Sequence, residues 1–440
     1  MHLRTPITLA AALVLSACTE TTSEVLPPLD RFYFPIGLAT TRVDGGAKTA
    51  LLVASSNFDL RYSAQGGGTL LSVASVASPG PVALLGAERI GSYAGPVAVA
   101  DEATCPGIGT GASAFVASRY DDKLYQFGIG AGGELTCGAD CVRGVQPGFD
   151  DPFAVSVACG TAGKWAFVGY LDPPPTTSAT VLGAWVSEID LANPSAAPRE
   201  VLMGDGPVRA MAHDATTDRL WATTQSSGAR ALLHSVVLSD PRWQGPAPWQ
   251  AVDTVDLFPL VHGAELRAIA VGSSPAAGVS RLFITARLYD AEVQASTGYR
   301  PSYDIGGVLI VLDVAEGTDG RPAVSIRAVE SLGLGVGDVA VVKRAVSAPD
   351  LVVATAADED LLYVYDDLTG ALVHAVGHDW AGSPIVGDRP MALAVDQVTP
   401  GLAADVYVAA FGSHVVKKFV LVPANPAALI VLNTIGGLAP

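Results

Sequence analysis

The sequence predicts an all-β protein, a seven-bladed β-propeller with four-stranded antiparallel blades. Two observations lead to this prediction: a strand pattern that recurs seven times, and a composition suited to many short strands. The chain has 440 residues, of which only 16% are charged, and it contains 47 Gly and 30 Pro. Frequent Gly and Pro between β-branched and aromatic runs are typical of short strands joined by turns.

Each repeat opens with a short apolar strand that begins at or after a Pro or an acidic residue. The seven first strands are PIGLAT at 35, PVAVAD at 96, PFAVSV at 152, PVRAMA at 207, ELRAIAV at 265, DVAVVK at 338 and PMALAV at 390. After a turn, second strands follow, such as ALLVASS at 50, and then third strands, such as KLYQFGI at 123. A weaker fourth strand is readable in the last unit as ALIVLNTIGG at 428. The two-residue alternation marks these runs as strands.

The repeats also predict how the units assemble. A four-stranded unit has two hydrophobic faces and cannot bury both alone. Packing seven units face to face around an axis buries these faces and leaves only short, protected sheet edges.

The last unit, GDRPMALAVDQVTPGLAADVYVAAFGSHVVKKFVLV, carries the clearest family pattern. It combines Pro390, the inner strand ALAV and a second strand that begins VYVA. In this pattern the chain resembles the YVTN-type seven-bladed β-propeller family, over roughly residues 31–440. The resemblance implies a fold and no particular chemistry. The fifth and sixth units depart from it because they lack the leading Pro.

The start of the chain has the features of a secretion signal. Arg4 precedes an apolar run that is too short to cross a bilayer, which requires about 20 residues. Residues 15–18, LSAC, resemble the lipobox of bacterial lipoproteins. This resemblance implies that residues 1–17 are removed and that acyl chains attach to Cys18. The alternative is an ordinary signal peptide that happens to contain a Cys.

The next segment predicts a membrane tether. Residues 18–30 are polar and Pro-rich, without strand or helix periodicity, and we expect a flexible link to the propeller at 31–440. Thr19, by resemblance to the sorting pattern of enteric lipoproteins, favours the outer membrane. We therefore expect the chain to be anchored to the membrane through its N-terminal lipid, with its body in the periplasm or at the cell surface.

Charge limits the partners. The net charge is −17, and loss of residues 1–17 removes Arg4 and no acid, which leaves −18. A body this acidic repels nucleic acid, so cations or basic protein surfaces are better partners.

Four cysteines remain in the body after Cys18. They are Cys105, Cys137, Cys141 and Cys159. An even number in an exported chain suggests disulfides, for which three pairings are possible. Cys137 and Cys141 could close a tight hairpin, which would leave Cys105 with Cys159. A metal site is the alternative, but no His lies near them in the sequence and their spacing matches no zinc pattern.

Three long loops fall on the propeller face where first strands begin and where strands 2 and 3 connect. They occupy residues 56–68, 171–180 and 288–307. The first and last mix aromatic, Arg and Asp residues, as binding surfaces do. The predicted contact residues are Phe58, Arg61, Tyr62, Tyr289, Tyr299, Arg300 and Tyr303. The alternative is that these loops are insertions packed on their own blades.

The same face receives a carboxylate in five of the seven units. These candidate metal ligands are Asp151, Asp205, Glu265, Asp338 and Asp388. Oxygen ligands of this kind suit Ca²⁺ or another divalent cation, although acids beside Pro and Gly also form turns.

Two functions are consistent with these features. The favoured one is a lipid-anchored, non-catalytic binding or scaffold module for a protein, peptide or glycan, acting through its channel-mouth loops. The alternative is a metal-dependent, lactonase-like hydrolase with a divalent cation in the central channel. No catalytic set of side chains can be assembled from the sequence.

Overall fold

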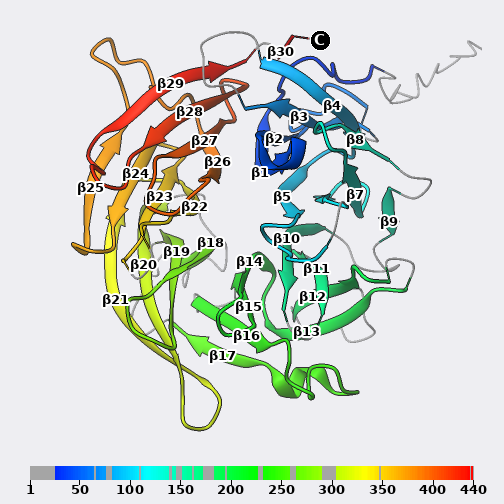
Figure 1. The fold of residues 1–440 in the computed structure, drawn as a ribbon, viewed down its shortest axis with the longest axis vertical. Helices are drawn as coiled ribbons and strands as arrows, with labels where there is room; N and C mark the ends of the chain where they lie inside the picture. Colours follow the sequence, from blue (N-terminus) through cyan, green and yellow to red (C-terminus); the bar gives the residue numbers. More distant parts are fainter. Residues whose placement is uncertain are drawn as a thin grey trace, which may run out of the picture.

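The structure is a computed structural model, and its strands form a ring of seven sheets (Figure 1). The described residues are 25–63, 66–75, 82–108, 111–137, 141–144, 151–160, 163–171, 183–193, 196–225, 231–257, 264–289, 304–345, 348–436 and 438–439. Cys18 and the proposed signal peptide lie outside these residues.

Within each blade the strands follow one another from the axis outward. The innermost strands are β1 (Pro35–Val43), β5 (Ala94–Ala100), β10 (Pro152–Cys159), β14 (Val208–Asp214), β18 (Ala264–Ser273), β22 (Val336–Val342) and β26 (Pro390–Asp396). The second strands are β2 (Lys48–Ser55), β6 (Ser113–Ser118), β11 (Lys164–Tyr170), β15 (Arg219–Gln225), β19 (Val279–Tyr289), β23 (Leu351–Ala356) and β27 (Ala404–Ala410). Two short 3₁₀ turns, η1 (Asp44–Gly46) and η2 (Pro248–Ala251), are the helical segments among the described residues.

The outer half of each blade completes the antiparallel sheet. The third strands are β3 (Gly68–Ala74), β7 (Lys123–Ile129), β12 (Gly183–Asp190), β16 (Ala231–Val237), β20 (Asp304–Glu316), β24 (Leu361–Asp366) and β28 (Val415–Leu421). The fourth strands are β4 (Val82–Ile90), β8 (Leu135–Thr136) with β9 (Val142–Gly144), β13 (Arg199–Asp205), β17 (Asp253–Asp256), β21 (Pro322–Leu332), β25 (Ala371–Val376) and β29 (Leu429–Ile435). The predicted seven-bladed fold is confirmed, and each first strand begins within two residues of its predicted start.

The hydrophobic core is divided among the seven blade interfaces, each of which holds one apolar cluster. Alternation along β2 shows how a single strand serves two interfaces. Leu51 and Val53 pack against blade 7, whereas Leu52 and Ala54 pack against blade 2. All four side chains are fully buried. The two-faced strands of the sequence therefore fit a propeller, in which every sheet is covered on both sides.

Each innermost strand carries a β-bulge near its start, where its pairing with the second strand shifts register. The skipped positions include Ile36, Pro96, Phe153, Arg209, Arg267, Asp338 and Met391. We call these seven residues the bulge ring. Bulges re-aim side chains beside functional sites, and all seven residues line the central channel.

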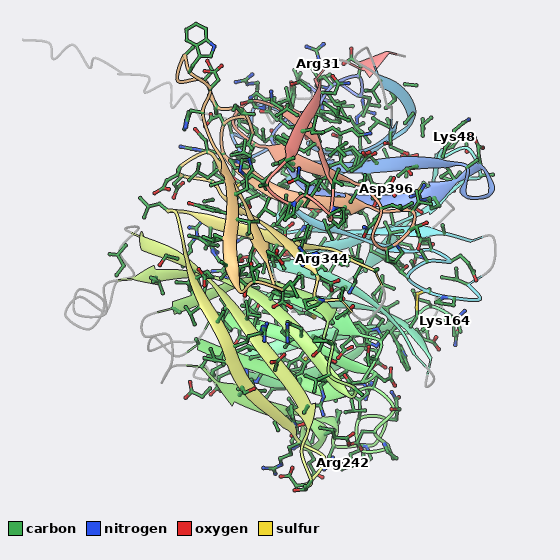
Figure 2. The ribbon with its side chains drawn as sticks, turned by 60° about the vertical axis from the view of Figure 1, so that its left-hand side comes forward. Arg31, Lys48, Lys164, Arg242, Arg344 and Asp396 are labelled. Carbon is green, nitrogen blue, oxygen red and sulfur yellow. A yellow bond between two sulfur atoms is a disulfide. The ribbon has the colours of Figure 1, made fainter. Side chains whose placement is uncertain are left out.

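The ring closes where the first and last blades meet, and a short strand from the C-terminal end joins the outer edge of blade 1. Blades 1 and 7 each contain four strands from one end of the chain, and β30 (Leu438–Ala439) adds a parallel fifth strand to β4. Side chains complete the joint: Thr40 Oγ1 donates to the Val395 carbonyl at 3.0 Å, and Arg42 pairs with Asp396. Asp396 is labelled in Figure 2.

Three interfaces share a further contact, which we call the turn clasp. The residue before the first strand of one blade donates its backbone N–H to a side chain in the strand 2–3 turn of the preceding blade. Asp151 N donates to Asp122 Oδ1 at 2.9 Å, and Arg389 N donates to Asp360 Oδ1 at 2.8 Å. The third contact, from Phe34 N to His414 Nδ1 at 3.0 Å, lies at the ring closure. The accepting residues have positive φ, a conformation that Asp tolerates better than most residues do.

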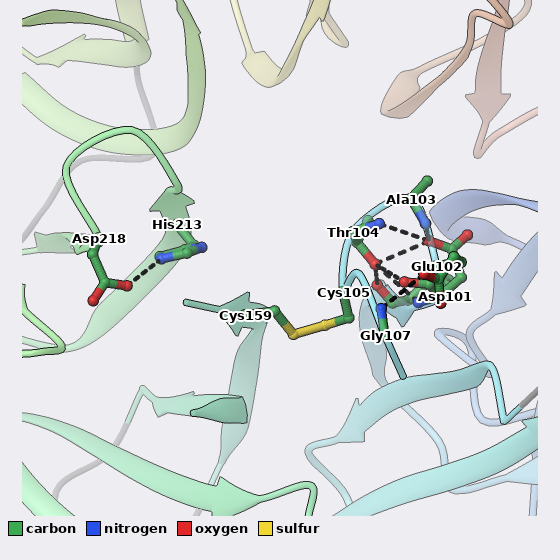
Figure 3. Close-up of a disulfide and its surroundings, with 10 residues drawn as sticks. Asp101, Glu102, Ala103, Thr104, Cys105, Gly107, Cys159, His213 and Asp218 are labelled. Carbon is green, nitrogen blue, oxygen red and sulfur yellow. Dashed lines mark hydrogen bonds and ion pairs between the residues drawn. A yellow bond between two sulfur atoms is a disulfide. The ribbon is translucent and has the colours of Figure 1, made fainter. Parts of the chain in front are cut away.

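Both disulfides join the cysteines as the hairpin hypothesis paired them. Cys105–Cys159 links the strand 1–2 connection of blade 2 to the end of β10 in blade 3 (Figure 3). Cys137–Cys141 bridges the interruption between β8 and β9, which pair with the two ends of the same strand, β7. One disulfide therefore joins two blades and the other holds together a split outer strand.

No helix in the described part of the chain is long and apolar enough to span a membrane.

Candidate functional site

The candidate site is the face of the ring where the first strands begin, together with the channel that opens there. Of the three loops predicted on this face, the first is described except for residues 64–65. Residues 172–182 and 290–303 lie outside the described residues, and with them Tyr299, Arg300 and Tyr303. Tyr289 is the last residue of β19.

The first loop is shaped by Asn57, whose side chain is fully buried. Asn57 Oδ1 accepts a hydrogen bond from Tyr62 N at 3.1 Å, and Nδ2 donates to the Tyr62 carbonyl at 3.0 Å. Nδ2 also donates to Ser92 Oγ at 3.0 Å, which ties the loop to the entry of blade 2. Gly67 has no space for a side chain, since a Cβ there would lie 2.4 Å from Asn57 Nδ2. The described part of the loop is therefore held by hydrogen bonds within the protein itself.

This loop is part of a chain of aromatic contacts that crosses three blades, which we call the aromatic ridge. Its members come from strand entries and from strand 2–3 turns of blades 7, 1 and 2. They are Tyr33, Phe34, Phe58, Tyr62, Tyr93, Tyr120, Phe411 and His414. Neighbouring rings lie within edge-to-face or stacking distance of one another.

Ring distances show how the ridge is connected. Phe34 lies 4.7 Å from Phe411 and 4.4 Å from His414, both in blade 7. Phe58 lies 5.4 Å from Phe411 and 6.2 Å from Tyr93, the residue that precedes blade 2. The ridge thus spans the joint where the first and last blades meet.

The ridge combines a buried base with an exposed crest. Phe411 is 7% exposed, whereas Phe58 is 56% and Tyr120 is 46% exposed. Arg61 lies above the Tyr33 ring at 5.9 Å and pairs with Asp59 at 3.2 Å. Burial and a hydrogen bond to the Asp59 carboxylate raise the pKa of Tyr33 above its ordinary value.

His414 joins the ridge to the turn clasp at the ring closure. Phe34 N donates to His414 Nδ1 at 3.0 Å, the position that Asp122 and Asp360 fill at other interfaces. Burial and the nearby Arg61 guanidinium lower the pKa of His414. The imidazole is therefore neutral at neutral pH and can accept this hydrogen bond.

The channel behind this face is a cavity of about 310 Å³ lined by the innermost strands of all seven blades. The bulge ring divides its wall into two arcs. Blades 7, 1, 2 and 3 contribute the apolar Met391, Ile36, Pro96 and Phe153. Blades 4, 5 and 6 contribute Arg209, Arg267 and Asp338, and Arg287 of β19 also lines the cavity.

The charged arc is held in place by a network between neighbouring blades. Glu265, 6% exposed, lies 3.2 Å from Arg209 and 3.0 Å from Arg267. Arg287, which pairs with Glu265 in the strand register, donates from Nε to the Val336 carbonyl at 3.3 Å. The guanidinium groups therefore line the channel from fixed positions.

Asp338 is the acidic member of the bulge ring. Its carboxylate accepts hydrogen bonds from Val339 N at 2.9 Å and from Leu393 N at 2.8 Å, the latter across to blade 7. Burial raises the pKa of Asp338 to about 6, although both backbone N–H groups act in the opposite direction.

The predicted metal ligands occupy different settings. Glu265 and Asp338 lie inside their strands and not before them, and Glu265 is paired with arginines. Asp151 pairs with Arg119 at 3.0 Å, and Asp205 and Asp388 are exposed. Among the described residues, no group of three or more His, Cys, Asp or Glu side chains is placed to hold a metal ion.

Known proteins resemble this chain in fold, but none identifies its family. No protein-family model matches the sequence, and no curated protein matches it. Hydrazine synthase of Kuenenia stuttgartiensis superposes with a TM-score of 0.55 at 12% identity, over 90% of this chain and 97% of that one. The similarity shows the β-propeller fold alone.

Two further structures are less similar. The dihydro-heme d1 dehydrogenase NirN gives a TM-score of 0.49 at 11% identity, over 91% of this chain and 67% of that one. The lectin of Aleuria aurantia gives 0.45 at 12% identity, over 94% and 99%. Neither similarity bears on the site.

The sequence predicted Phe58, Arg61 and Tyr62 as one surface, and the structure places all three at the aromatic ridge. It missed the blade 7 and blade 2 members, because residues far apart in the chain meet only when the ring closes. It also missed the channel arginines. Their signal was present, since Arg209 and Arg267 stand in inner strands where most other units have apolar residues.

Proposed function

We propose that this chain is a lipid-anchored, non-catalytic binding module of the bacterial cell envelope, which holds a protein partner on its aromatic ridge. The observation that carries the proposal is the ridge itself: a pre-formed aromatic surface with exposed Phe58 and Tyr120 at its crest. Exposed aromatic side chains with a neighbouring Arg are typical of the residues that dominate protein interfaces.

Exposed aliphatic residues enlarge the same surface. Leu60 is 45% exposed two residues after Phe58, and Val25 and Leu26 are 60% and 47% exposed. Ser63 N donates to the Val25 carbonyl at 3.1 Å, which joins the start of the described chain to this face. These exposed aliphatic side chains beside the rings favour a protein over a glycan, because a sugar offers few apolar groups to cover them.

The chain length between the proposed lipid and the propeller supports a partner close to the membrane. Residues 25–30 belong to the described structure, where Pro27 is buried and Leu29 packs against the blade 7 and blade 1 cluster. The segment from Cys18 to Val25 can span at most about 25 Å when fully extended. With Cys18 lipidated, Val25, which contacts the first loop, would stand within that distance of the bilayer surface.

Crosslinking in living cells, followed by mass spectrometry, tests this function. We expect the wild-type chain to capture a defined envelope protein. The double variant Phe58→Ala with Tyr120→Ala should reduce that capture at least about tenfold, as the loss of two interface anchors predicts.

A matched control uses the opposite face. Val398 and Leu402, 76% and 60% exposed, lie in the connection between β26 and β27. The double variant Val398→Ala with Leu402→Ala should capture the partner as the wild type does. Equal capture by the ridge variant and the wild type would reject the ridge, and enrichment of glycans in place of a protein would reject the protein partner.

Metal-dependent hydrolysis, the other function that the sequence allowed, has no comparable support in the described residues. The carboxylates nearest the channel are paired with arginines or hydrogen-bonded to the backbone.

A further inference from the structure

One tryptophan stands almost entirely in water on the face where the first strands begin, which we call the first-strand face. Trp380 lies in residues 377–389, the connection between β25 and β26, and it is 99% exposed. Trp is the largest apolar residue and is highly buried on average in folded proteins. Trp221 and Trp243 of blade 4 follow that rule and are fully buried. Among the large apolar residues of the described chain, Trp380 is therefore the most exposed.

The loop around Trp380 is a hydrogen-bonded hairpin. Asp379 N donates to the Ser383 carbonyl at 2.9 Å, and Gly382 N donates to the Asp379 carbonyl at 3.0 Å. The Asp379 carboxylate closes the turn by accepting from Ala381 N at 2.8 Å and from Ser383 N at 2.9 Å. Gly382 has a φ of 80°, a conformation that glycine adopts without steric cost. Trp380 thus occupies the tip of a defined turn.

The base of the hairpin is fixed to the body of the propeller. Val386 is fully buried in the apolar cluster between blades 6 and 7, and Ile385 packs against the same cluster. Ile385 N donates to the Gly377 carbonyl at 2.7 Å, which closes the base. His378 Nε2 lies 3.7 Å from Asp360 Oδ2, in the turn between β23 and β24. The core therefore holds the base of the hairpin while the tip carries the indole into solvent.

The proposed membrane tether starts from the same face. Val25 lies on the first-strand face, because its carbonyl accepts a hydrogen bond from Ser63 N in the first loop. The segment from Cys18 to Val25 spans at most about 25 Å. The opposite face lies one strand length further away, which is roughly 25 Å for the eight residues of β2. With acyl chains on Cys18, the tether is therefore too short to let the opposite face rest on the bilayer, and the first-strand face is the one that can.

The chemistry of an exposed indole suits the boundary between water and lipid. Its ring is apolar, while its N–H remains a hydrogen-bond donor, and Trp is enriched at membrane interfaces for this reason. The net charge of −17 provides no attraction to an anionic lipid surface, so a membrane contact has to depend on apolar insertion. The opposite face also has an exposed tryptophan, Trp249, at 58%. Exposure alone therefore does not distinguish the two faces, but the tether does.

We propose that Trp380 inserts into the interfacial region of the bilayer to which Cys18 is attached, and that this second contact turns the first-strand face toward the membrane. The inference rests on the lipid anchor of the proposed function and deepens that function. A partner held on the aromatic ridge would then lie at the bilayer surface as well, because the ridge and Trp380 share one face.

Quenching of tryptophan fluorescence by brominated lipid tests this contact. The full chain, purified with its acyl chains, is reconstituted into zwitterionic phosphatidylcholine vesicles with or without bromine on the lipid chains. Flotation of the vesicles first shows whether the chain is anchored to them. Bromine quenches an indole only at close range, so we expect quenching of the wild type and its loss in Trp380→Ala. This variant should fold as the wild type does, because a side chain so exposed contributes little to packing.

Trp249→Ala is the matched control, because it removes an exposed tryptophan from the opposite face. It should be quenched to the same extent as the wild type. Circular dichroism checks that both variants fold.

Three results would overturn the contact: no quenching of a wild-type chain that floats with the vesicles, equal quenching of the wild type and Trp380→Ala, or loss of quenching in Trp249→Ala. Equal quenching combined with reduced partner capture by Trp380→Ala would assign this residue to a protein interface. A wild-type chain that does not float would reject the anchor and, with it, the inference. Unchanged partner capture by the ridge variant would reject the ridge alone, so the two proposals can fail separately.

Discussion

At the residue scale, the bulge ring shows how one position per blade can decide the character of a channel. A bulge turns one side chain out of the regular alternation of a strand. Here the seven side chains that are turned in this way all line the cavity. Four are apolar and three are charged. The charged residues are neighbours around the ring, in blades 4, 5 and 6, so the channel has two chemically distinct sides.

Asp338 gives a prediction at this scale. Its pKa is about 6 in the folded protein, against an ordinary 3.8, because of burial. A carboxyl with a raised pKa stabilises the fold fully below the ordinary pKa, and this contribution is lost as the pH rises through 6. Between pH 7.5 and 4, the wild type should gain roughly 1–3 kcal/mol of unfolding free energy relative to Asp338→Asn.

Urea unfolding of both proteins across this pH range provides the measurement. The informative quantity is the change with pH in the difference between their free energies of unfolding. Asn loses one of the two backbone hydrogen bonds, but this loss is the same at every pH and does not alter that change. A difference that stays constant from pH 7.5 to 4 would show that Asp338 titrates normally.

At the element scale, interfaces between blades do more than bury apolar faces. Cys105–Cys159 joins blades 2 and 3, beside a turn in which Asp101 Oδ1 accepts from Ala103 N and Thr104 N (Figure 3). Cys137–Cys141 keeps β8 and β9 aligned on β7. The turn clasps add a backbone-to-side-chain hydrogen bond at this same joint, at the joint between blades 6 and 7, and at the ring closure.

The clasp at the ring closure differs from the others because its acceptor is an imidazole. Protonation of His414 Nδ1 removes the acceptor for Phe34 N. A His whose folded pKa is lowered stabilises the fold above its ordinary pKa, and this contribution is lost as the pH falls below about 6.5. His414→Asn keeps a neutral acceptor in a residue that tolerates positive φ.

The variant should therefore resist acid better than the wild type. Relative to His414→Asn, the wild type should lose about 1 kcal/mol of unfolding free energy between pH 7.5 and 5, in addition to a constant difference from the ring contacts that Asn lacks. Urea unfolding monitored by tryptophan fluorescence measures this. Parallel loss of stability in both proteins between pH 7.5 and 5 would argue against the imidazole as the sensitive group.

At the scale of the whole molecule, the ring brings the two ends of the described chain to one joint. Phe32 and Leu38 pack with Tyr407 and Ala409 at the interface between blades 1 and 7, and β30 lies along β4. The aromatic ridge is built over this joint. A ligand on the ridge would therefore contact the first and last blades together.

The proposed anchor gives the prediction at this scale. Cys18→Ala should release the chain from the membrane fraction or stall its processing, because the acyl chains would have no thiol to attach to. Fractionation of cells and mass spectrometry of the mature N-terminus measure both effects. Cys137→Ser with Cys141→Ser is a control that removes two thiols without touching the anchor. A Cys18→Ala chain that stays processed and membrane-bound would reject the lipobox interpretation.

Much of the fold could be read from the sequence, because each blade is a local pattern. First-strand starts such as Pro35, Pro152 and Pro390 coincide with the observed strands, and others differ by two residues at most. The cysteine hairpin hypothesis also held, since its partners are close in the chain or in adjacent blades. The split of the fourth strand in blade 2 and the β30 addition had no comparable local signal.

The sequence by itself therefore determined the repeat, the number of blades and the two-faced core, because the alternation of side chains along a strand depends only on neighbouring residues. Only the tertiary structure decided the site. Phe58 meets Phe411 across more than three hundred positions, and Arg209 meets Glu265 across a blade interface. The physical reason is ring closure together with a bulge in each inner strand, because these two features set which distant side chains face each other. The residue pattern of a single blade does not encode that arrangement.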